Sequence, residues 1–282
     1  MLRLIGMSLE ALILISIIIL IGIGAWLLAE RLSLLEVPAE ALFELEEGEK
    51  PEIRIVSVYD NYQADHNLTT AWGFGCVVKT PNELILFDTG GDSRILLSNM
   101  EKLNISPSSI RKVVISHIHG DHTGGLEEFL ERNNNVTVFI PSSFPRSFKD
   151  MVTWKGAELA EVSGPENISD FVYTTGELYG PPEEQSLIID SRKGMVIITG
   201  CAHPGIVSIV KKAKELMPEN KVYLVLGGFH SPPVSCVKEF KELGVEKVAP
   251  SHCTGDVVRE EFRKKYKENF IEYGVGKTIE IR

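Results

Sequence analysis

The sequence lacks the features of several protein classes. It holds only four cysteines in 282 residues, without the regular spacing of a disulfide framework: Cys76, Cys201, Cys236 and Cys253. It has no tandem repeat and no low-complexity tract, and 44% hydrophobic with 24% charged residues is ordinary for a folded protein. These absences exclude a disulfide-stapled miniprotein, a collagen-like fibre and a disordered chain.

An excess of positive charge is also missing. The formal net charge is −10, from 39 acidic and 29 basic residues. An acidic chain is poorly suited to binding phosphate backbones, so we expect no nucleic acid among its partners.

Charged side chains are absent from one stretch near the N-terminus, residues 11–29. A helix of that length rises about 28 Å, close to the roughly 30 Å hydrocarbon core of a bilayer. We therefore expect one N-terminal transmembrane helix that acts as a single-pass membrane anchor. The flanking charges are balanced, so they leave open on which side of the membrane the rest of the chain lies.

Three segments follow from this pattern: an anchor over residues 1–31, a Glu-rich linker over 32–51 and a catalytic domain over 52–282. Beyond residue 51, short apolar runs alternate with amphipathic stretches, which predicts sheets covered by helices. The Pro- and Gly-rich segment 141–184 is expected to be an irregular insertion, a lid or substrate wall.

The histidines are not scattered at random. His117, His203, His230 and His252 each follow an apolar run. Residues just past a buried strand stand at the rim of a sheet, where loops converge into sites. We therefore expect one site assembled from distant segments, whereas His66 follows no apolar run and is expected to lie outside it.

The densest cluster is Ser-His-Ile-His-Gly-Asp-His-Thr-Gly-Gly over residues 116–125. Imidazole and carboxylate are ligands that zinc and similar divalent ions prefer, and Gly120 allows the loop to turn and supply two neighbouring ions. The expected metal ligands are His117, His119, Asp121 and His122 from the loop, with His203 and His252 from later strand ends.

Two further residues have open roles. His230 is either a ligand or a group that gives a proton or hydrogen bond to substrate. Asp88 ends another buried run and is expected to hold a ligand histidine through its second ring nitrogen, with a helix cap as the alternative.

Together these residues resemble the metallo-β-lactamase superfamily. Further motifs are similar to its dihydropteroate-synthase-like branch: Tyr-Asp-Asn at 59–61, Trp-Gly-Phe-Gly at 72–75, Glu-Gln-Ser-Leu at 184–187, Thr-Gly-Cys-Ala-His-Pro-Gly-Ile at 199–206, Gly-Gly-Phe-His at 227–230 and Ser-His-Cys-Thr-Gly at 251–255. The resemblance covers about residues 52–282. It implies an α+β fold, a four-layer αβ/βα sandwich with a mono- or dinuclear metal site at one edge.

The resemblance also implies roles for single residues. His117 and His119 resemble ligands of a first metal, and Asp121 and His122 of a second. The expected catalytic residues are Asp121, His230 and Asp88, and the expected substrate-binding residues are Asp60, Asn61, Glu184 and Gly205.

One departure concerns residues 199–201, where Thr-Gly-Cys stands in place of the usual Thr-Gly-Asp. Cys201 is therefore either a soft ligand or a buried bystander. A histidine usual before that strand is also missing, with Glu184-Gln185 in its place.

The expected function is that of a metal-dependent enzyme acting on a phosphorylated small molecule. One or two divalent ions are expected, zinc first, with manganese, iron and magnesium as alternatives. The branch is associated with dihydropterin–aminobenzene-ribofuranoside 5′-phosphate synthases of methanopterin biosynthesis, which implies a transferase. A metallo-hydrolase of a phosphoester, lactone or amide is the alternative, and a non-enzymatic metal-binding scaffold is less favoured. The sequence leaves the oligomeric state open.

Overall fold

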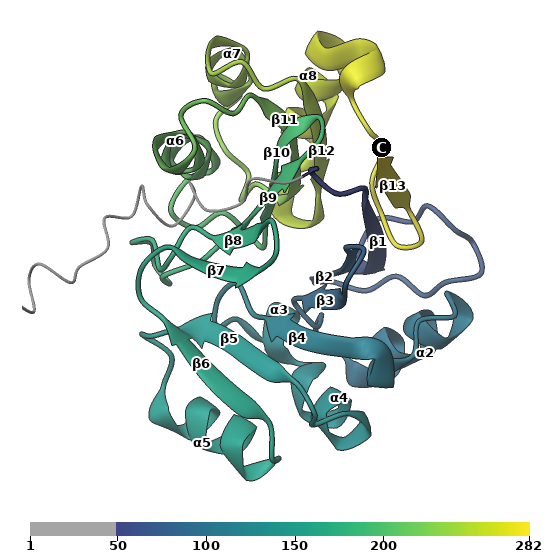
Figure 1. Cartoon of the computed structure of the whole chain (residues 1–282). Helices are drawn as coiled ribbons and strands as arrows, with labels where there is room; N and C mark the ends of the chain where they lie inside the picture. Colours follow the sequence, from purple (N-terminus) through teal and green to yellow (C-terminus); the bar gives the residue numbers. More distant parts are fainter. Residues whose placement is uncertain (1–48) are drawn as a thin grey trace, which may run out of the picture. The chain divides into compact units, whose positions relative to one another are not determined.

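The computed structural model describes residues 49–282, in which strands from two sheets alternate with helices (Figure 1). The first sheet has seven strands in the order β13-β1-β2-β3-β4-β5-β6. Their bounds are β1 (Ile53–Asp60), β2 (Phe74–Lys79), β3 (Leu84–Phe87), β4 (Ile110–Val114), β5 (Thr137–Pro141), β6 (Glu158–Val162) and β13 (Thr278–Ile281). β3 to β6 run parallel, whereas β1 pairs antiparallel with β2 and β13.

The second sheet has six strands in the order β12-β11-β10-β9-β8-β7. Their bounds are β7 (Glu166–Ser169), β8 (Val172–Thr174), β9 (Leu187–Ser191), β10 (Gly194–Thr199), β11 (Val222–Gly228) and β12 (Lys247–Ser251). β10, β11 and β12 are parallel neighbours, so their carboxyl ends meet at the same edge.

Helices cover the outer face of each sheet (Figure 1). α2 (Ser93–Lys102), α4 (Leu126–Arg132) and α5 (Arg146–Trp154) pack on the first sheet. α6 (Ile206–Leu216), α7 (Cys236–Glu242) and α8 (Asp256–Tyr266) pack on the second. The remaining short elements are α3 (Gly120–Thr123), η2 (Pro107–Ser109), η3 (His252–Thr254) and η4 (Lys267–Asn269).

The burial of β10 explains the layering. Val196 and Ile198 belong to the apolar cluster between the sheets, whereas Met195 and Ile197 belong to the cluster beneath the helices. Successive strand side chains point to opposite faces, so a strand buried on both faces reads as a continuous apolar run. A third cluster joins the first sheet to its helices, and the expected four-layer α+β arrangement is confirmed.

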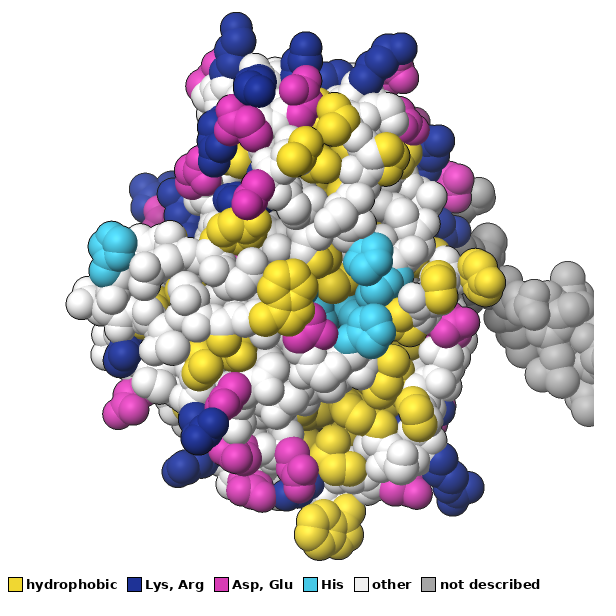
Figure 2. All heavy atoms as spheres, turned by 180° about the vertical axis from the view of Figure 1, so that it is seen from behind, with side chains coloured by type: hydrophobic (Ala, Val, Ile, Leu, Met, Phe, Trp, Pro, Cys, Tyr) yellow, Lys and Arg dark blue, Asp and Glu magenta, His cyan; other side chains and the backbone are white. Residues whose placement is uncertain are grey.

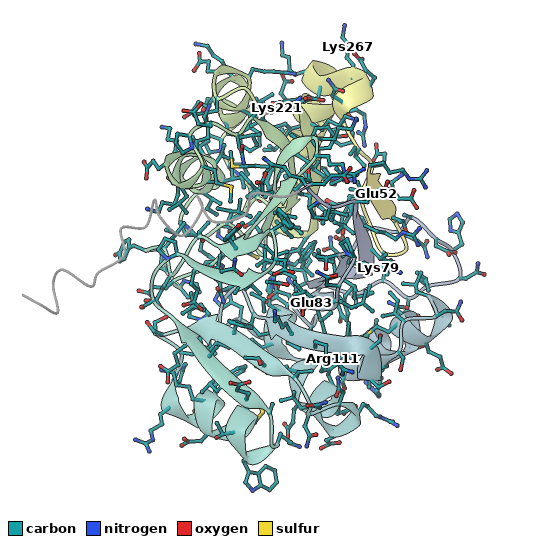
Figure 3. The ribbon with its side chains drawn as sticks, in the orientation of Figure 1. Glu52, Lys79, Glu83, Arg111, Lys221 and Lys267 are labelled. Atoms are coloured by element: carbon teal, nitrogen blue, oxygen red, sulfur yellow. The ribbon has the colours of Figure 1, made fainter. Side chains whose placement is uncertain are left out.

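Most charged side chains lie outside these apolar layers, and Asp60, Asp88 and Glu184 are buried exceptions. Figure 3 labels four exposed cations at strand and helix ends: Lys79, Arg111, Lys221 and Lys267.

The expectation of an irregular insertion over residues 141–184 is wrong. This segment contains α5 and the strands β6, β7 and β8, so it completes the edges of both sheets. The strands are short and β6 is largely polar, with the burial pattern exposed, intermediate, intermediate, exposed, buried. An edge strand of this kind has little apolar periodicity, which is why the Pro and Gly residues dominated the pattern.

The expectation of a transmembrane helix and a membrane location is also corrected. Among residues 49–282, no helix is long and apolar enough to cross a bilayer. The longest described helices, α6 and α8, have 11 residues each, whereas a span needs about 20. The stretch 11–29, on which that expectation rested, lies outside the described residues, as does most of the expected linker. The boundary expected at residue 52 stays a prediction, with β1 beginning at Ile53.

Candidate metal centre

The candidate site lies at the carboxyl ends of strands from both sheets. Asp88 follows β3, residues 117–122 follow β4, His203 follows β10, His230 follows β11 and His252 follows β12. Several of these loop residues have positive φ: Asp88, Ala202, His230 and His252. Such backbone is rare for residues with a Cβ and concentrates where side chains are aimed at functional sites.

Three histidines form one group, here called the three-histidine position: His117, His119 and His203. One ring nitrogen from each lies within 4.8 Å of the others. His117 Nε2 is 3.1 Å from His119 Nδ1, and the His203 ring centroid is 4.7 Å from that of His117.

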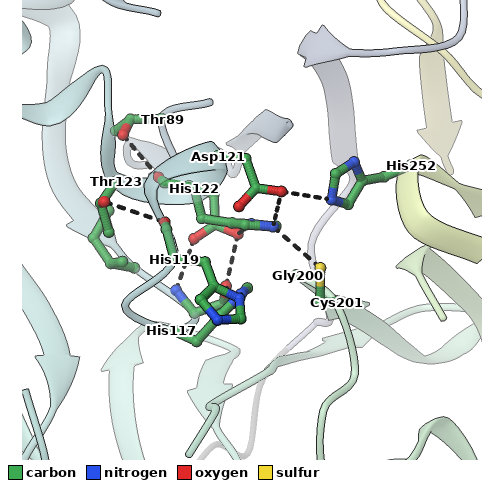
Figure 4. Close-up of polar contacts among 12 residues, drawn as sticks. Thr89, His117, His119, Asp121, His122, Thr123, Gly200, Cys201 and His252 are labelled. Atoms are coloured by element: carbon green, nitrogen blue, oxygen red, sulfur yellow. Dashed lines mark hydrogen bonds and ion pairs between the residues drawn. The ribbon is translucent and has the colours of Figure 1, made fainter. Parts of the chain in front are cut away.

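A second group beside it is here called the mixed position: Asp121, His122, Cys201 and His252. Asp121 Oδ2 lies 3.3 Å from His252 Nε2 and 3.7 Å from His122 Nε2 (Figure 4). Cys201 Sγ lies 3.3 Å from the same His122 nitrogen. The His117 and His122 ring centroids are 4.2 Å apart, so the two positions are neighbours.

Asp88 is fully buried beneath the mixed position. Its Oδ2 atom is 2.7 Å from His122 Nδ1, and its carboxylate accepts hydrogen bonds from the Ser116 backbone N–H and hydroxyl, both at 2.7 Å. Asp92, not Asp88, caps α2. The expected catalytic role of Asp88 is therefore revised to one of holding His122, because a fully buried carboxylate cannot contact substrate directly.

Glu184 has a different role from the expected contact with substrate. Its carboxylate is buried and accepts hydrogen bonds from Thr199 Oγ1 and from four successive backbone N–H groups, residues 200–203. These bonds fix the loop that carries Cys201 and His203. Gly200 lets this loop approach the first sheet, since a Cβ there would lie 2.1 Å from Ser116 Oγ.

Asp60 and Asn61, which were expected to contact substrate, lie beside the ligand candidate His252. Asn61 Oδ1 is 2.9 Å from His252 Nδ1, and Asn61 Nδ2 donates to the His252 carbonyl at 3.3 Å. Asp60 is fully buried and accepts a hydrogen bond from the Tyr62 backbone N–H. Burial raises the pKa of Asp60 to about 7. Asn61 thus supports His252 from the first sheet.

The electrostatics favour neutral imidazoles at His117, His203 and His252, whose pKa values are lowered, whereas at His122 the Asp88 carboxylate outweighs burial and raises the pKa. Burial strongly lowers the pKa of His117, and burial with the neighbouring His230 lowers that of His203 to about 4. Burial alone would raise the pKa of Asp121, but its contacts with His252 and His122 outweigh this and hold it well below its usual range. Neutral imidazole and ionised carboxylate are the forms that bind metal ions.

The remaining predicted residues lie at the rim or away from the site. His230 is exposed, with its ring centroid 4.3 Å from that of His203. Gly205 is exposed at the start of α6, with φ of 91°. His66 is exposed and contacts Gln63, as expected for a residue outside the site.

Two residues of the site were missed. Cys253 Sγ lies 3.2 Å from Cys201 Sγ, although its place beside His252 in the sequence was a usable signal. Trp72 is 59% exposed, and its ring centroid is 4.8 Å from that of His252. Figure 2 shows histidine side chains gathered on one face beside acidic and apolar groups.

The donor set fits one or two divalent metal ions. Among residues 49–282, the ring atoms His203 Nε2 and His252 Nε2 are buried without a hydrogen-bond partner. Buried polar atoms are normally paired, so these nitrogens are expected to bind a ligand that the protein itself does not supply. Nitrogen, oxygen and sulfur donors together suit zinc best among the common divalent ions.

Comparisons with known proteins agree with this geometry. Residues 76–252 match the Metallo-beta-lactamase superfamily. The chain is 33% identical to the 7,8-dihydropterin-6-methyl-4-(beta-D-ribofuranosyl)-aminobenzene-5'-phosphate synthase of Methanocaldococcus jannaschii, over 70% of this chain and 84% of that protein.

Two solved structures share the fold. One is a metal-dependent hydrolase of the beta-lactamase superfamily, with a TM-score of 0.68 and 24% identity over 81% of this chain and 99% of that chain. The other is a diphosphatase from the PhnP family, with a TM-score of 0.58 and 14% identity over 82% of this chain and 97% of that chain.

Proposed function

The chain belongs to the metallo-beta-lactamase superfamily, and we propose that it is a metal-dependent enzyme acting on a phosphorylated small molecule. The observation that carries this proposal is that two neighbouring ligand groups lie at the carboxyl ends of strands from both sheets. His117, His119 and His203 would hold one ion. Asp121, His122 and His252, with Cys201, would hold a second.

When bound, divalent ions at these positions would polarise a phosphoryl oxygen and neutralise the charge of a leaving group. The protein's own groups would orient the substrate around them. The exposed imidazole of His230 stands beside His203, where it would give a hydrogen bond or a proton to the departing oxygen.

A phosphate-binding role for the start of α6 supports the choice of substrate class. α6 begins at Ile206, close in sequence to His203, and the first N–H groups of a helix have no intrahelical partners. Such N–H groups bind phosphate oxygens, so Gly205 and the first turn of α6 are the proposed phosphate site. A crystal soaked with a phosphate-bearing ligand should place the phosphate at residues 203–207, and a phosphate bound elsewhere would contradict this.

For the reaction, we propose a transferase that joins a dihydropterin-6-methyl diphosphate to an aminobenzene ribofuranoside phosphate. The 33% identity to the synthase named above favours this reaction over the alternative, a metallo-hydrolase of a phosphoester, lactone or amide. The exposed ring of Trp72 beside His252 would suit a substrate with planar rings.

The test is incubation of the metal-loaded protein with the pterin diphosphate, with and without the aromatic acceptor. A coupled product that forms only when the acceptor is present supports the transferase. Turnover of the diphosphate in water alone contradicts it and supports the hydrolase. A His66→Ala variant, altered outside the site, is the control for substitution of a histidine as such.

A further inference from the structure

We propose that Cys201 and Cys253 form a redox-responsive thiol pair, and that its oxidation to a disulfide removes the sulfur ligand of the mixed position. The part that concerns metal rests on the proposed function, because it takes the mixed position to hold an ion. The part that concerns the thiols rests on their geometry alone.

The two sulfur atoms already lie close together. Cys201 Sγ and Cys253 Sγ are 3.2 Å apart, although the residues follow different strands, β10 and β12. A disulfide bond is about 2.0 Å long, so the sulfurs must approach each other by roughly 1 Å.

Both cysteines are carried by backbone that is tied in place. The Cys201 N–H donates to Glu184 Oε1 at 3.0 Å, and the Cys253 carbonyl accepts from the Ser231 N–H at 2.9 Å. A pair held together in the folded chain does not have to find its partner, which favours disulfide formation over other fates of an oxidised thiol.

Access differs between the two thiols. Cys253 is half-buried, whereas Cys201 is only 4% exposed. We therefore expect a peroxide to react first with Cys253, with Cys201 as the resolving thiol. The other two cysteines, Cys76 and Cys236, are buried in the apolar clusters and lie outside this pair.

The reaction balances with hydrogen peroxide as the oxidant. The Cys253 sulfur attacks one peroxide oxygen, the O–O bond breaks, and a sulfenic acid and one water form. The Cys201 sulfur then attacks the Cys253 sulfur, and the hydroxyl leaves with a proton as a second water. Two thiols lose two electrons and two protons, and one peroxide becomes two waters.

The consequence falls on the mixed position; Cys201 and Cys253 also belong, with His230, to a third group of possible ligands. Cys201 Sγ lies 3.3 Å from His122 Nε2 within the mixed position. A disulfide sulfur is a poor metal ligand compared with a thiolate, so oxidation leaves this position with Asp121, His122 and His252. The three-histidine position contains no sulfur and should keep its ion.

The experiment uses the reduced full-length protein, with and without zinc, treated with hydrogen peroxide. Free thiols, intact mass, disulfide-linked peptides and zinc per chain are measured before and after. We expect free thiols to fall from four to two with or without zinc, with Cys201 linked to Cys253. We expect the zinc-loaded chain to lose about one of its two ions, and a thiol reductant with added zinc to restore it.

Two variants sharpen the test. Cys253→Ser should form no disulfide and keep its zinc, whereas Cys236→Ser should form the same disulfide and lose the same zinc as the natural chain, with its free thiols falling from three to one. Four surviving thiols in the metal-free natural chain, or a different pairing, would overturn the thiol pair. A disulfide formed without loss of zinc, or a reduced chain that binds no zinc, would overturn the ligand role of Cys201. None of these measurements uses turnover, so an inactive enzyme in the assay of the proposed function is a separate result.

Discussion

Asp88 holds His122 from behind: the Asp88 Oδ2 atom lies 2.7 Å from His122 Nδ1, and both side chains are fully buried. A carboxylate at Nδ1 fixes the ring so that Nε2 faces Asp121 and Cys201. The same carboxylate accepts hydrogen bonds from the Ser116 N–H and hydroxyl, so one buried charge also fixes the position of residue 116, where the loop that carries His117, His119, Asp121 and His122 begins.

Asp88→Asn should therefore weaken zinc binding by about 10- to 100-fold, because the amide no longer fixes the tautomer of His122. Competition with a chelating dye measures the affinity. The matched control is Asp92→Asn, which changes the carboxylate that caps α2 and should leave the affinity unchanged. Equal affinities for Asp88→Asn and the natural chain would rule out this role.

His203→Ala should remove about one metal ion per chain, because it leaves the three-histidine position with two ligands. Metal analysis after dialysis against a metal-buffered solution measures the content. His66→Ala is the control, since His66 is exposed and its ring nitrogen lies 3.2 Å from Gln63 Oε1, outside the candidate site. A His203→Ala chain with full metal content would exclude His203 as a ligand.

Glu184→Gln should lower the free energy of unfolding by about 1–3 kcal/mol. If the amide NH₂ replaces Oε2, it cannot accept the hydrogen bond that the His203 N–H now donates to that oxygen. Urea unfolding of the metal-free protein measures this. Glu183→Gln changes the neighbouring carboxylate, which is not fully buried, and should cost far less. Equal losses for both variants would mean that the loop over residues 199–203 does not depend on Glu184.

Trp72→Ala should raise the KM of the substrate that proves active by about 2- to 10-fold with little change in kcat, because a stacked aromatic pair contributes about 0.5–1.5 kcal/mol. Steady-state kinetics measures both constants, and Trp72→Phe should restore most of the loss. Trp154→Ala is the control, since Trp154 is 80% exposed at the end of α5. An unchanged KM would place the planar part of the substrate elsewhere.

Asp60 should make stability fall as pH rises. Burial raises its pKa in the folded chain from 3.8 to about 7, so the folded state holds this proton more tightly than the unfolded state. The contribution to stability is present below pH 4 and is lost as pH rises towards 7, at most about 4 kcal/mol. Asp60→Asn removes this loss while keeping an oxygen for the Tyr62 N–H.

The free energy of unfolding of metal-free Asp60→Asn, relative to the natural chain, should therefore increase between pH 4 and pH 8. Urea unfolding at several pH values measures it, and metal-free protein avoids the pH dependence of metal binding itself. A difference that stays constant with pH would show that Asp60 ionises normally in the folded chain.

Much of the fold follows from local pattern. The expected alternation of sheet strands and covering helices beyond residue 51 is present, because continuous apolar runs and amphipathic repeats are properties of neighbouring residues. The edge strand β6 was missed, since a short and largely polar strand carries little of that signal. Hydropathy also suggested a membrane span that the described helices do not provide.

By itself, the sequence determined that residues of the kinds that bind metal ions follow several buried apolar runs. The sequence places the His- and Asp-rich loop over residues 116–125 after one apolar run, and His203, His230 and His252 after later ones. These conclusions need only the order of residues along the chain, because a strand end places the next residues at the rim of a sheet.

Only the tertiary structure decided how those residues combine. It placed His203 with His117 and His119, and His252 with Asp121 and His122. It also brought together pairs distant in sequence, such as Cys201 with Cys253. Such groupings depend on how strand ends from two separate sheets face each other, a relationship set by packing across the core that no local pattern records.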